Sequence, residues 1–270
     1  MAGGISIERH VGGMQGVWAL TLTHTGKFNA MSRSMWAELK SVMQAVQADS
    51  QARCVLVRGD GGHFCAGGDI AEYPSFRFDA DALRHFHEQE VWGGLQAMLD
   101  CDVPLVAVIE GNCMGAGMEI ASCCDIRLAT DSARFGAPIA RLGFPMAPRE
   151  AGLVGRVAGA TVARAMLLAA EIFEAPAMLG HSFLTRMVSP SELDAAAREW
   201  AGRMAGLAPQ AARLNKQTLR ESFRPSAQVE YAQEAPDLIA NNASDPYAYA
   251  DSPEHREGIS AFLDKRKPAF

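Results

Sequence analysis

Two glycine-rich segments, each of which follows a short apolar run, are the strongest chemical signal in the chain. One covers residues 59–68 and follows the apolar run 54–57, and the other covers residues 111–117 and follows the run 105–109. A glycine lets a backbone N–H approach a bound group with no side chain in the way. In α/β proteins, loops at the carboxyl ends of strands hold the ligand. We therefore expect the two loops to lie side by side and to direct two N–H groups at one oxygen atom.

The elements that position these loops alternate between strand and helix in the first half of the chain. Ser32 is the expected N-cap of a helix that extends to about residue 48, because apolar residues recur there at helical spacing. A second helical segment is expected over residues 81–100. Strands are expected at residues 17–23, 54–57, 105–109, 126–129 and 186–189. This alternation is typical of βα units whose sheet is covered by helices, whereas the pattern after about residue 190 is helical throughout.

Composition excludes several classes of protein. The 270 residues carry 25 Lys and Arg against 31 Asp and Glu, a net charge of −6, which argues against nucleic-acid binding and against docking on anionic lipid. The apolar runs are too short to span a bilayer, and the first 17 residues contain no continuous apolar core of a secretion signal. The six cysteines form no C-x-x-C pair. We therefore expect reduced thiols in a cytoplasmic protein.

Nucleotide and metal motifs are also absent from the sequence. No P-loop and no G-x-S-x-G nucleophile motif occurs, and Gly115-Ala116-Gly117 is followed by Ile120 where a dinucleotide fingerprint needs glycine. His85 and His87 are two residues apart, which places them on different faces of a helix. A solvated polar face, and no metal site, is the interpretation we favour for these histidines.

Six ordered pieces of sequence resemble the crotonase family, which is the enoyl-CoA hydratase/isomerase superfamily. The two longest are Phe64-Cys65-Ala66-Gly67-Gly68-Asp69-Ile70 and Gly111-Asn112-Cys113-Met114-Gly115-Ala116-Gly117-Met118-Glu119-Ile120. The shorter ones are Phe28-Asn29-Ala30-Met31, Cys124-Asp125-Ile126, Phe135-Gly136-Ala137-Pro138 and the ending at residues 262–270. Each piece alone is weak, but together they cover nearly the whole chain in the family's order.

This resemblance implies an α/β fold of a particular kind. Residues 1–189 are expected to form a crotonase-like spiral of repeated ββα units that holds the acyl-CoA site. Residues 190–270 are expected to form a C-terminal helical region that assembles a homotrimer or a dimer of trimers. The family needs no metal or resident cofactor, since coenzyme A enters only as part of the acyl-CoA thioester substrate.

The resemblance also implies chemistry through a thioester enolate. Carried over by motif position, the N–H groups of Ala66 and Ala116 are the expected oxyanion-hole donors. Relatives usually have glycine where Ala116 stands, so the donor survives only if the backbone there tolerates a Cβ. Glu119 matches the acid/base glutamate, and a carboxyl group that faces an apolar acyl pocket should have a raised pKa.

Substrate-binding positions follow from the same motifs. Gly67, Gly68 and Asp69 are expected along the pantetheine path. The other expected contacts of the substrate are Ile70, Gly115 and Ile139. Lys27 is a candidate phosphate contact, with a solvated surface lysine as the alternative.

The chain departs from the family at one catalytic position. Hydratases have a second glutamate directly after F-G-x-P, where this chain has Ile139. Glu150 is a candidate replacement, with ordinary helix-start chemistry after Pro148 as the alternative. Arg149 either binds a substrate carboxylate or is solvated, and His63 either faces the acyl pocket or is solvated.

Several functions therefore stay open at this point. Hydration is the family's commonest activity, whereas a single glutamate suffices for Δ3-Δ2 enoyl-CoA isomerisation. Other one-base reactions, thioester hydrolysis and decarboxylation among them, use the same oxyanion hole. A non-catalytic acyl-CoA-binding homologue is the alternative from another class.

Overall fold

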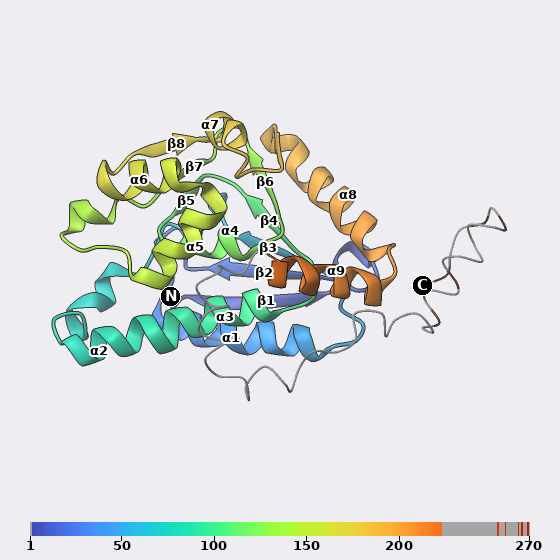
Figure 1. The fold of residues 1–270 in the computed structure, drawn as a ribbon, viewed down its shortest axis with the longest axis horizontal. Coiled ribbons are helices and arrows are strands. Elements are labelled where there is room, and N and C mark those ends of the chain that lie inside the picture. The colour runs from blue at the N-terminus through green and yellow to red at the C-terminus, as the bar shows by residue number, and fades with distance from the viewer. Residues whose placement is uncertain are drawn as a thin grey trace. The chain divides into compact units, whose positions relative to one another are not determined.

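The computed structural model describes residues 2–222 and, beyond them, Pro253, Glu257, Asp264, Arg266 and Ala269. Two compact units divide the chain, Met1–Ala205 and Gly206–Phe270. The first unit is a sheet with helices on both faces (Figure 1). Within the described ranges, no helix combines the length and the apolar character needed to cross a membrane.

The main sheet has six strands in the order β1-β2-β3-β4-β6-β9. β1 is antiparallel to β2, and every later neighbour pair is parallel. The carboxyl ends of β2, β3, β4 and β6 therefore meet at one edge. The strands are β1 (Gly4–Arg9), β2 (Val17–Thr23), β3 (Cys54–Gly59), β4 (Leu105–Ile109), β6 (Ile126–Thr130) and β9 (Arg186–Val188).

A smaller sheet of three strands in the order β5-β7-β8 makes the fold a spiral. Its members are β5 (Asn112–Met114), β7 (Arg134–Gly136) and β8 (Ile172–Glu174). The chain alternates between the sheets: β4 precedes β5 and helix α4 (Ala116–Cys123), and β6 then precedes β7. This confirms the predicted crotonase-like α/β spiral.

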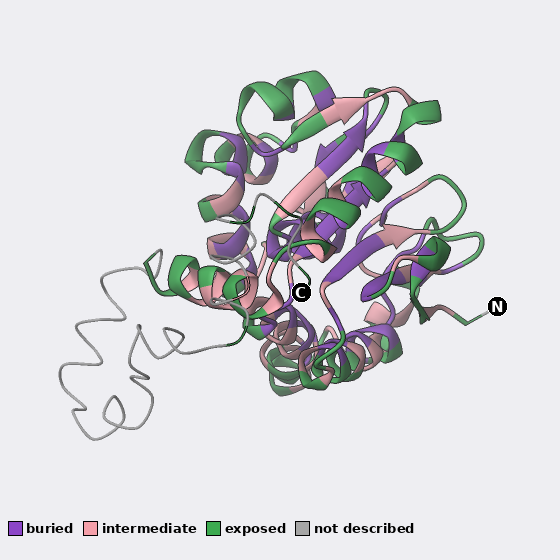
Figure 2. Ribbon diagram, turned by 90° about the vertical axis from the view of Figure 1, so that its right-hand side faces the viewer, coloured by how far each residue is buried: buried purple, intermediate pink, exposed green. Residues whose placement is uncertain are grey.

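Side chains that alternate between the two faces of the buried strands form two hydrophobic layers. Trp18, Leu20 and Leu22 of β2 belong to one core cluster, whereas Val17 and Ala19 belong to the other. Successive side chains of a strand point to opposite faces, so each parallel strand supplies both layers. Purple, buried strands accordingly lie between helices with green, exposed outer faces (Figure 2).

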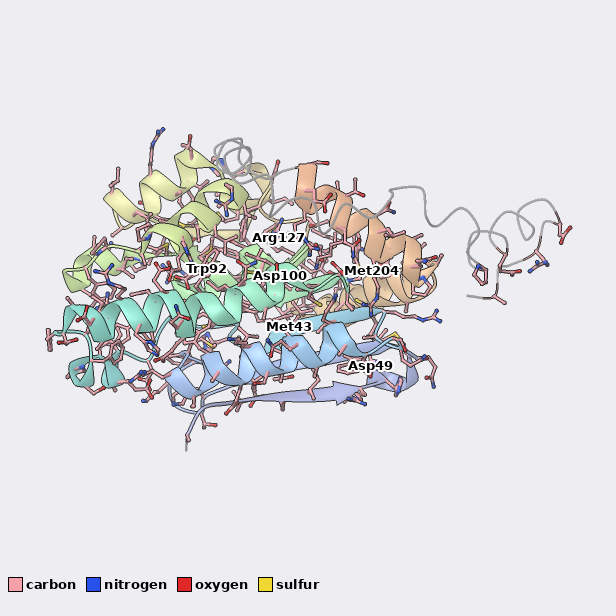
Figure 3. All side chains as sticks on the ribbon, turned by 60° about the horizontal axis from the view of Figure 1, so that its bottom comes forward. Met43, Asp49, Trp92, Asp100, Arg127 and Met204 are labelled. Carbon is pink, nitrogen blue, oxygen red and sulfur yellow. The ribbon has the colours of Figure 1, made fainter. Side chains whose placement is uncertain are left out.

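Helices cover the two faces of the main sheet. Helices α1 (Arg33–Ala48) and α3 (Trp92–Asp100) pack on each other and, with α4, enclose the larger cluster, to which Met43 of α1 belongs (Figure 3). Helix α8 (Leu193–Ala205) packs on β3, β4 and β6 and closes the smaller cluster. The remaining helices of this unit are α2 (Ala80–His85), α5 (Pro148–Ala158), α6 (Ala160–Leu168) and α7 (Ala175–Gly180).

The predicted elements are largely confirmed, and one of them is wrong in detail. Ser32 caps α1, since its hydroxyl accepts the N–H of Met35 at 3.3 Å. The expected strands all form, within two residues of their predicted ends. The segment predicted as a single helix over residues 81–100 instead has a π-helical turn at Phe86–Val91 between α2 and α3.

The described structure tests only some of the predictions made for residues 190–270. Helix α8 belongs to the first unit, and α9 (Pro209–Ser222) belongs to the second. The boundary at residue 190 and the trimer-forming role stay predictions. Of the family-like ending at 262–270, only Asp264, Arg266 and Ala269 lie within the described residues. All six cysteines are buried and free of disulfides.

Candidate active site

The two glycine-rich loops pack directly on each other, as their spacing predicts. The N–H of Cys65 donates to the carbonyl of Asn112, and the N–H of Met114 donates to the carbonyl of Cys65, both at 2.9 Å. A Cβ added at Gly117 would lie 2.6 Å from the Cys65 carbonyl oxygen. A glycine at this position therefore lets helix α4 begin against the first loop.

The N-terminal motif at residues 28–31 forms hydrogen bonds with the backbone of the first glycine-rich loop. Asn29 has a φ of 61°, and its side-chain amide donates to the carbonyls of Asp60 and His63 at 2.8 and 2.7 Å. The N–H of Met31 donates to the carbonyl of Gly67 at 2.8 Å. Buried asparagine tolerates a left-handed backbone when its side chain is satisfied locally. The motif therefore contributes to the site through the backbone of the loop.

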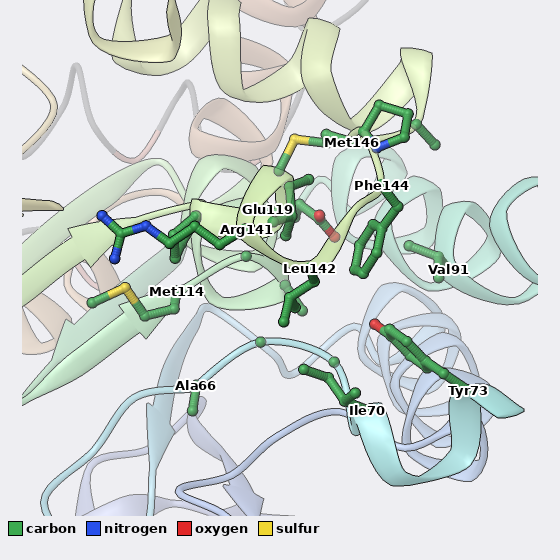
Figure 4. A pocket seen from close by; sticks show the side chains of 18 of the residues that line it. Ala66, Ile70, Tyr73, Val91, Met114, Glu119, Arg141, Leu142, Phe144 and Met146 are labelled. Carbon is green, nitrogen blue, oxygen red and sulfur yellow. The ribbon is translucent and has the colours of Figure 1, made fainter. Parts of the chain in front are cut away.

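A cavity of about 470 Å³ opens where the two loops and the segment after β7 converge (Figure 4). Its walls are mostly apolar and aromatic, with few polar groups, as small-molecule sites usually are. The lining residues include Trp36, Gly67, Gly68, Ile70, Tyr73, Arg77, His87, Val91, Met114, Gly115, Ala116, Glu119, Ile139, Arg141, Leu142, Phe144 and Met146.

The structure disagrees with one of the two predicted oxyanion donors. The N–H of Ala66 donates to the carbonyl of Phe28 at 3.0 Å, so it is already engaged. Two residues further on, Gly68 lines the cavity, and among the described residues its N–H has no hydrogen-bond partner. Motif position alone does not show which N–H of the loop is engaged by the N-terminal motif.

The second predicted donor is available. Ala116 is the first residue of α4, its φ is not positive, and in the described part of the chain its N–H has no partner. The preceding Gly115 takes the unusual backbone conformation, with a φ of 49°, so the Cβ of Ala116 causes no strain. The positive end of the α4 dipole adds to the attraction for an anion at this N–H.

Glu119 lies in the first turn of α4 and points its carboxyl group into the cavity (Figure 4). Its side chain is buried among apolar neighbours, with 8% exposure. Burial, and secondarily the negative charge of Glu150, raises the pKa of Glu119 to about 8. A group with this pKa is mostly protonated at neutral pH and is suited to proton transfer.

Glu150 lies where helix-start chemistry predicts, and its role as a replacement for the second glutamate stays a prediction. It lies in the first turn of α5, which begins at Pro148, and its side chain is 3% exposed. It does not line the cavity. Its Oε1 instead lies 3.0 Å from Nδ1 of His87, and His87 does line the cavity. The carboxylate therefore contacts the cavity wall through the imidazole of His87.

His87 is the functional candidate that the sequence analysis missed. The assignment of residues 85 and 87 to a solvated polar face holds for His85, whose side chain is 62% exposed, but is wrong for His87, at 20%. His87 belongs to the π-helical turn at Phe86–Val91 and lies two residues from His85, so the two side chains take different faces of the helical segment and only His87 faces inward. Turns of this kind are frequent at functional sites, but nothing in the local sequence predicts this one.

The predicted substrate contacts are mostly brought together. Gly67, Gly68, Ile70, Gly115 and Ile139 all line the cavity. Asp69 does not: its carboxylate caps the N–H of Ala71 and pairs with Lys27 Nζ at 2.6 Å. Lys27 is thus held at the edge of the loop with its side chain 41% exposed.

Two further sequence candidates lie outside the cavity. His63 Nδ1 accepts the N–H of Asn112 at 3.2 Å, which joins the two glycine loops. Arg149 pairs with Glu88 at 3.1 Å, and its side chain is 53% exposed. Within the described ranges, no group of three His, Cys, Asp or Glu side chains could hold a metal ion.

Tyr73 and Phe144 enter the site from segments with no motif. Tyr73 points its hydroxyl into the cavity opposite Phe144, and the two ring centroids lie 5.9 Å apart (Figure 4). Burial raises the pKa of the Tyr73 phenol, in part opposed by the nearby positive charge of Arg77. Only the tertiary fold brings these rings to the glycine loops.

Comparison with known proteins gives a consistent result. The family model for enoyl-CoA hydratase/isomerase matches residues 12–270. A 2,3-dehydroadipyl-CoA hydratase from Escherichia coli is 31% identical over 264 residues, which cover 97% of this chain and 98% of that protein. A crotonyl-CoA hydratase from Syntrophomonas wolfei is 28% identical and covers 90% of this chain and 89% of its own.

The solved structures agree. A crystal structure described as an enoyl-CoA hydratase/carnithine racemase from Magnetospirillum magneticum superposes with a TM-score of 0.83 at 30% identity. The match covers 95% of this chain and 92% of that one.

Proposed function

The chain belongs to the enoyl-CoA hydratase/isomerase family, whose members act on acyl-CoA thioesters, and we propose that it adds water to a 2-enoyl-CoA. One arrangement carries the proposal. Two groups that can move protons, Glu119 and the His87–Glu150 pair, reach the same cavity as the N–H groups of Gly68 and Ala116.

The two N–H groups are proposed to form the oxyanion hole. When water attacks the β-carbon, negative charge develops on the thioester oxygen. Preorganised donors stabilise that charge without reorganising, and removal of one such donor typically costs about 10²–10³-fold in rate. Gly68 replaces Ala66 in this role because the Ala66 N–H is engaged by Phe28.

The proton transfers follow from the surroundings of the two groups. Because the pKa of Glu119 is about 8, its carboxyl group carries the proton that the α-carbon gains. Glu150 accepts the Nδ1–H of His87, which leaves Nε2 free to take a proton from water. The water oxygen bonds to the β-carbon, and proton exchange then restores both groups.

Ile139 favours one second candidate, double-bond isomerisation. It lines the cavity at the position where the family resemblance implies a second glutamate. A single carboxylate can remove a proton from one carbon and return it to another. In that reaction Glu119 acts in its ionised form, so the two candidates predict opposite pH dependence.

The proposal also covers the cofactor requirement, the compartment and the assembly of the enzyme. Coenzyme A enters as part of the substrate, and no resident cofactor or metal takes part. The six buried cysteines, none of which forms a disulfide, fit a reducing cytoplasmic compartment. Assembly as a homotrimer or dimer of trimers is kept from the family resemblance.

Mass spectrometry of an acyl-CoA panel incubated in deuterated water tests the reaction. Hydration predicts the gain of one water and one carbon-bound deuterium on a 2-enoyl-CoA. A shifted double bond with no added water would indicate isomerisation instead. Release of free CoA or carbon dioxide would move the protein to a hydrolase or decarboxylase branch. Binding with no product from any panel member would support a non-catalytic homologue.

His87→Gln is expected to lower the hydration rate about 100-fold, because a positioned general base typically contributes 10²–10⁴-fold. The amide can still donate to Glu150, so the fold should remain intact. His85→Gln, in the same segment but exposed, should change the rate less than twofold. Full hydration by the His87 variant would contradict the assignment, and purified proteins of equal thermal stability make the comparison valid.

A further inference from the structure

Arg77 lines the cavity, and its guanidinium has no anionic partner among the described residues. Its Nη1 atom is buried from solvent, and no described residue accepts a hydrogen bond from it. In the described part of the chain no carboxylate pairs with its guanidinium. Burial lowers the pKa of this guanidinium from its ordinary value. A buried cation without an anion is costly, which makes its surroundings informative.

Aromatic rings hold the guanidinium in a defined place. Its Cζ lies 3.6 Å from the ring centroid of Phe144 and 4.7 Å from that of Tyr73. Stacking of this kind fixes the plane of the group and leaves the N–H donors at its edge available. The side chain is therefore oriented but not satisfied.

Three other arginines of this unit, Arg33, Arg127 and Arg149, are paired with oxygen atoms. Arg33 forms a two-pronged pair with Glu90, and Arg127 donates to the carbonyls of Phe183 and Cys124. Arg149 stacks over Trp92 at 5.5 Å but also pairs with Glu88. An arginine that combines stacking with an unpaired, buried Nη1 in a substrate cavity differs from these.

We infer that Arg77 binds a carboxylate at the far end of the acyl chain, so that the preferred substrate is an ω-carboxylated enoyl-CoA. This inference rests on the proposed function, since it names the substrate class of the same cavity. A guanidinium presents donors in a fork that matches a carboxylate, and charge-assisted bonds are about twice as strong as neutral ones.

Tyr73 connects the two ends of this site. A Cβ placed on Gly68 would lie 2.2 Å from the Tyr73 hydroxyl, so that hydroxyl is beside the proposed oxyanion hole. The face of the same ring carries Arg77. An acyl chain that starts at Gly68 and follows the tyrosine ring ends at the guanidinium.

The test compares substrates that differ only at the far end. Hex-2-enoyl-CoA ends in a methyl group, and 5-carboxypent-2-enoyl-CoA has a carboxylate in its place. We expect kcat/KM to be at least tenfold higher for the carboxylated substrate in the wild-type enzyme. Four- and eight-carbon pairs extend the comparison to other chain lengths.

Arg77→Met should abolish that preference. The carboxylated substrate should lose about 30- to 100-fold in kcat/KM, and hex-2-enoyl-CoA should change less than threefold. Arg77→Lys, which keeps the charge but not the fork, should retain part of the preference. Arg149→Met is the matched control, because it also removes a stacked arginine, but one outside the cavity that already has a partner.

Each outcome separates the inference from the proposed function. Turnover of both substrates with no preference at any chain length, or a preference that survives Arg77→Met, would overturn the inference and leave hydration standing. An equal rise of KM for both substrates in Arg77→Met would assign the side chain to the coenzyme A moiety and overturn it too. No turnover of either substrate by the wild-type enzyme would instead reject the proposed function.

Discussion

Glu119→Gln should reduce hydration about 10³-fold while leaving acyl-CoA binding within threefold of wild type. The amide has nearly the shape of the carboxyl group, but it holds no proton that it can give to carbon. General acid catalysis typically contributes 10²–10⁴-fold, and the oxyanion hole would remain. Steady-state rates and calorimetric binding of the same thioester measure the two effects separately.

The direction in which kcat/KM changes with pH distinguishes an acid role of Glu119 from a base role. For hydration with Glu119 as the acid, kcat/KM should fall as pH rises through about 8, where the pKa of Glu119 lies. Isomerisation with Glu119 as the base would show the reverse, a rise through the same pH. The residual rate of Glu119→Gln should be flat across this range. A wild-type profile that is flat around pH 8 would contradict both roles for this carboxyl group.

Stability should respond to the same ionisation. The pKa of Glu119 is about 8 in the folded state against an ordinary 4.5, so the unfolded chain loses this proton first. The wild-type protein therefore loses stability as pH rises from about 4.5 to above 8, whereas the glutamine variant does not. We expect Glu119→Gln to be more stable than wild type at pH 9 by roughly 2–4 kcal/mol, measured by urea unfolding.

A surface carboxylate provides the control for both measurements. Glu8 lies on β1 with an exposed side chain, so Glu8→Gln should leave the rate and the stability difference between pH 5 and pH 9 unchanged. Equal activity of the Glu119→Gln and Glu8→Gln enzymes would remove Glu119 from the mechanism.

Gly117→Ala should lower kcat about 100-fold, although alanine is the better helix former. The added Cβ would lie 2.6 Å from the Cys65 carbonyl oxygen and 3.1 Å from the Cys65 Cβ. Both neighbours belong to the first glycine loop, so α4 and this loop must separate. A shift of about 1 Å in positioned donors can cost 10²-fold in rate. We also expect a loss of about 1–3 kcal/mol in the free energy of unfolding.

Gly202→Ala is the matched control for this substitution. Gly202 is likewise within a helix, α8, and a Cβ there would meet no heavy atom within 4 Å. Its replacement should keep the rate and raise stability by up to about 1 kcal/mol. Full activity of Gly117→Ala would show that the two loops are not held in register through this contact.

The local elements could be predicted because their physical causes are local. The sequence pattern predicts the apolar runs of β2, β3 and β4. It also predicts the Ser32 cap and the helical spacing of α1. The two glycine loops could be placed together because parallel strands end at one edge of a sheet. The resemblance of the second loop to the family predicts Glu119 as the acid/base residue, and the structure places it in the uniformly buried helix α4.

Three features of the site could not be predicted, because each depends on contacts between distant segments. The Ala66 N–H is engaged by Phe28, which lies 38 positions earlier in the chain, so the available donor is Gly68. His87 contacts Glu150, which lies 63 residues away in the chain. Arg77 reaches the cavity because it stacks on Phe144.

The sequence by itself therefore determined the family, the strand-and-helix order and the carboxyl group that faces the acyl cavity. The element order depends on hydrophobic periodicity, whereas the family and the carboxyl group follow from the resemblance of the motifs around the two glycine loops. The tertiary structure alone decided that, in the described part of the chain, the Gly68 N–H has no partner, His87 contacts the buried Glu150 and Arg77 pairs with no carboxylate. Hydrogen-bond satisfaction is a property of the packed chain, because every buried donor and acceptor competes for partners that folding brings within reach.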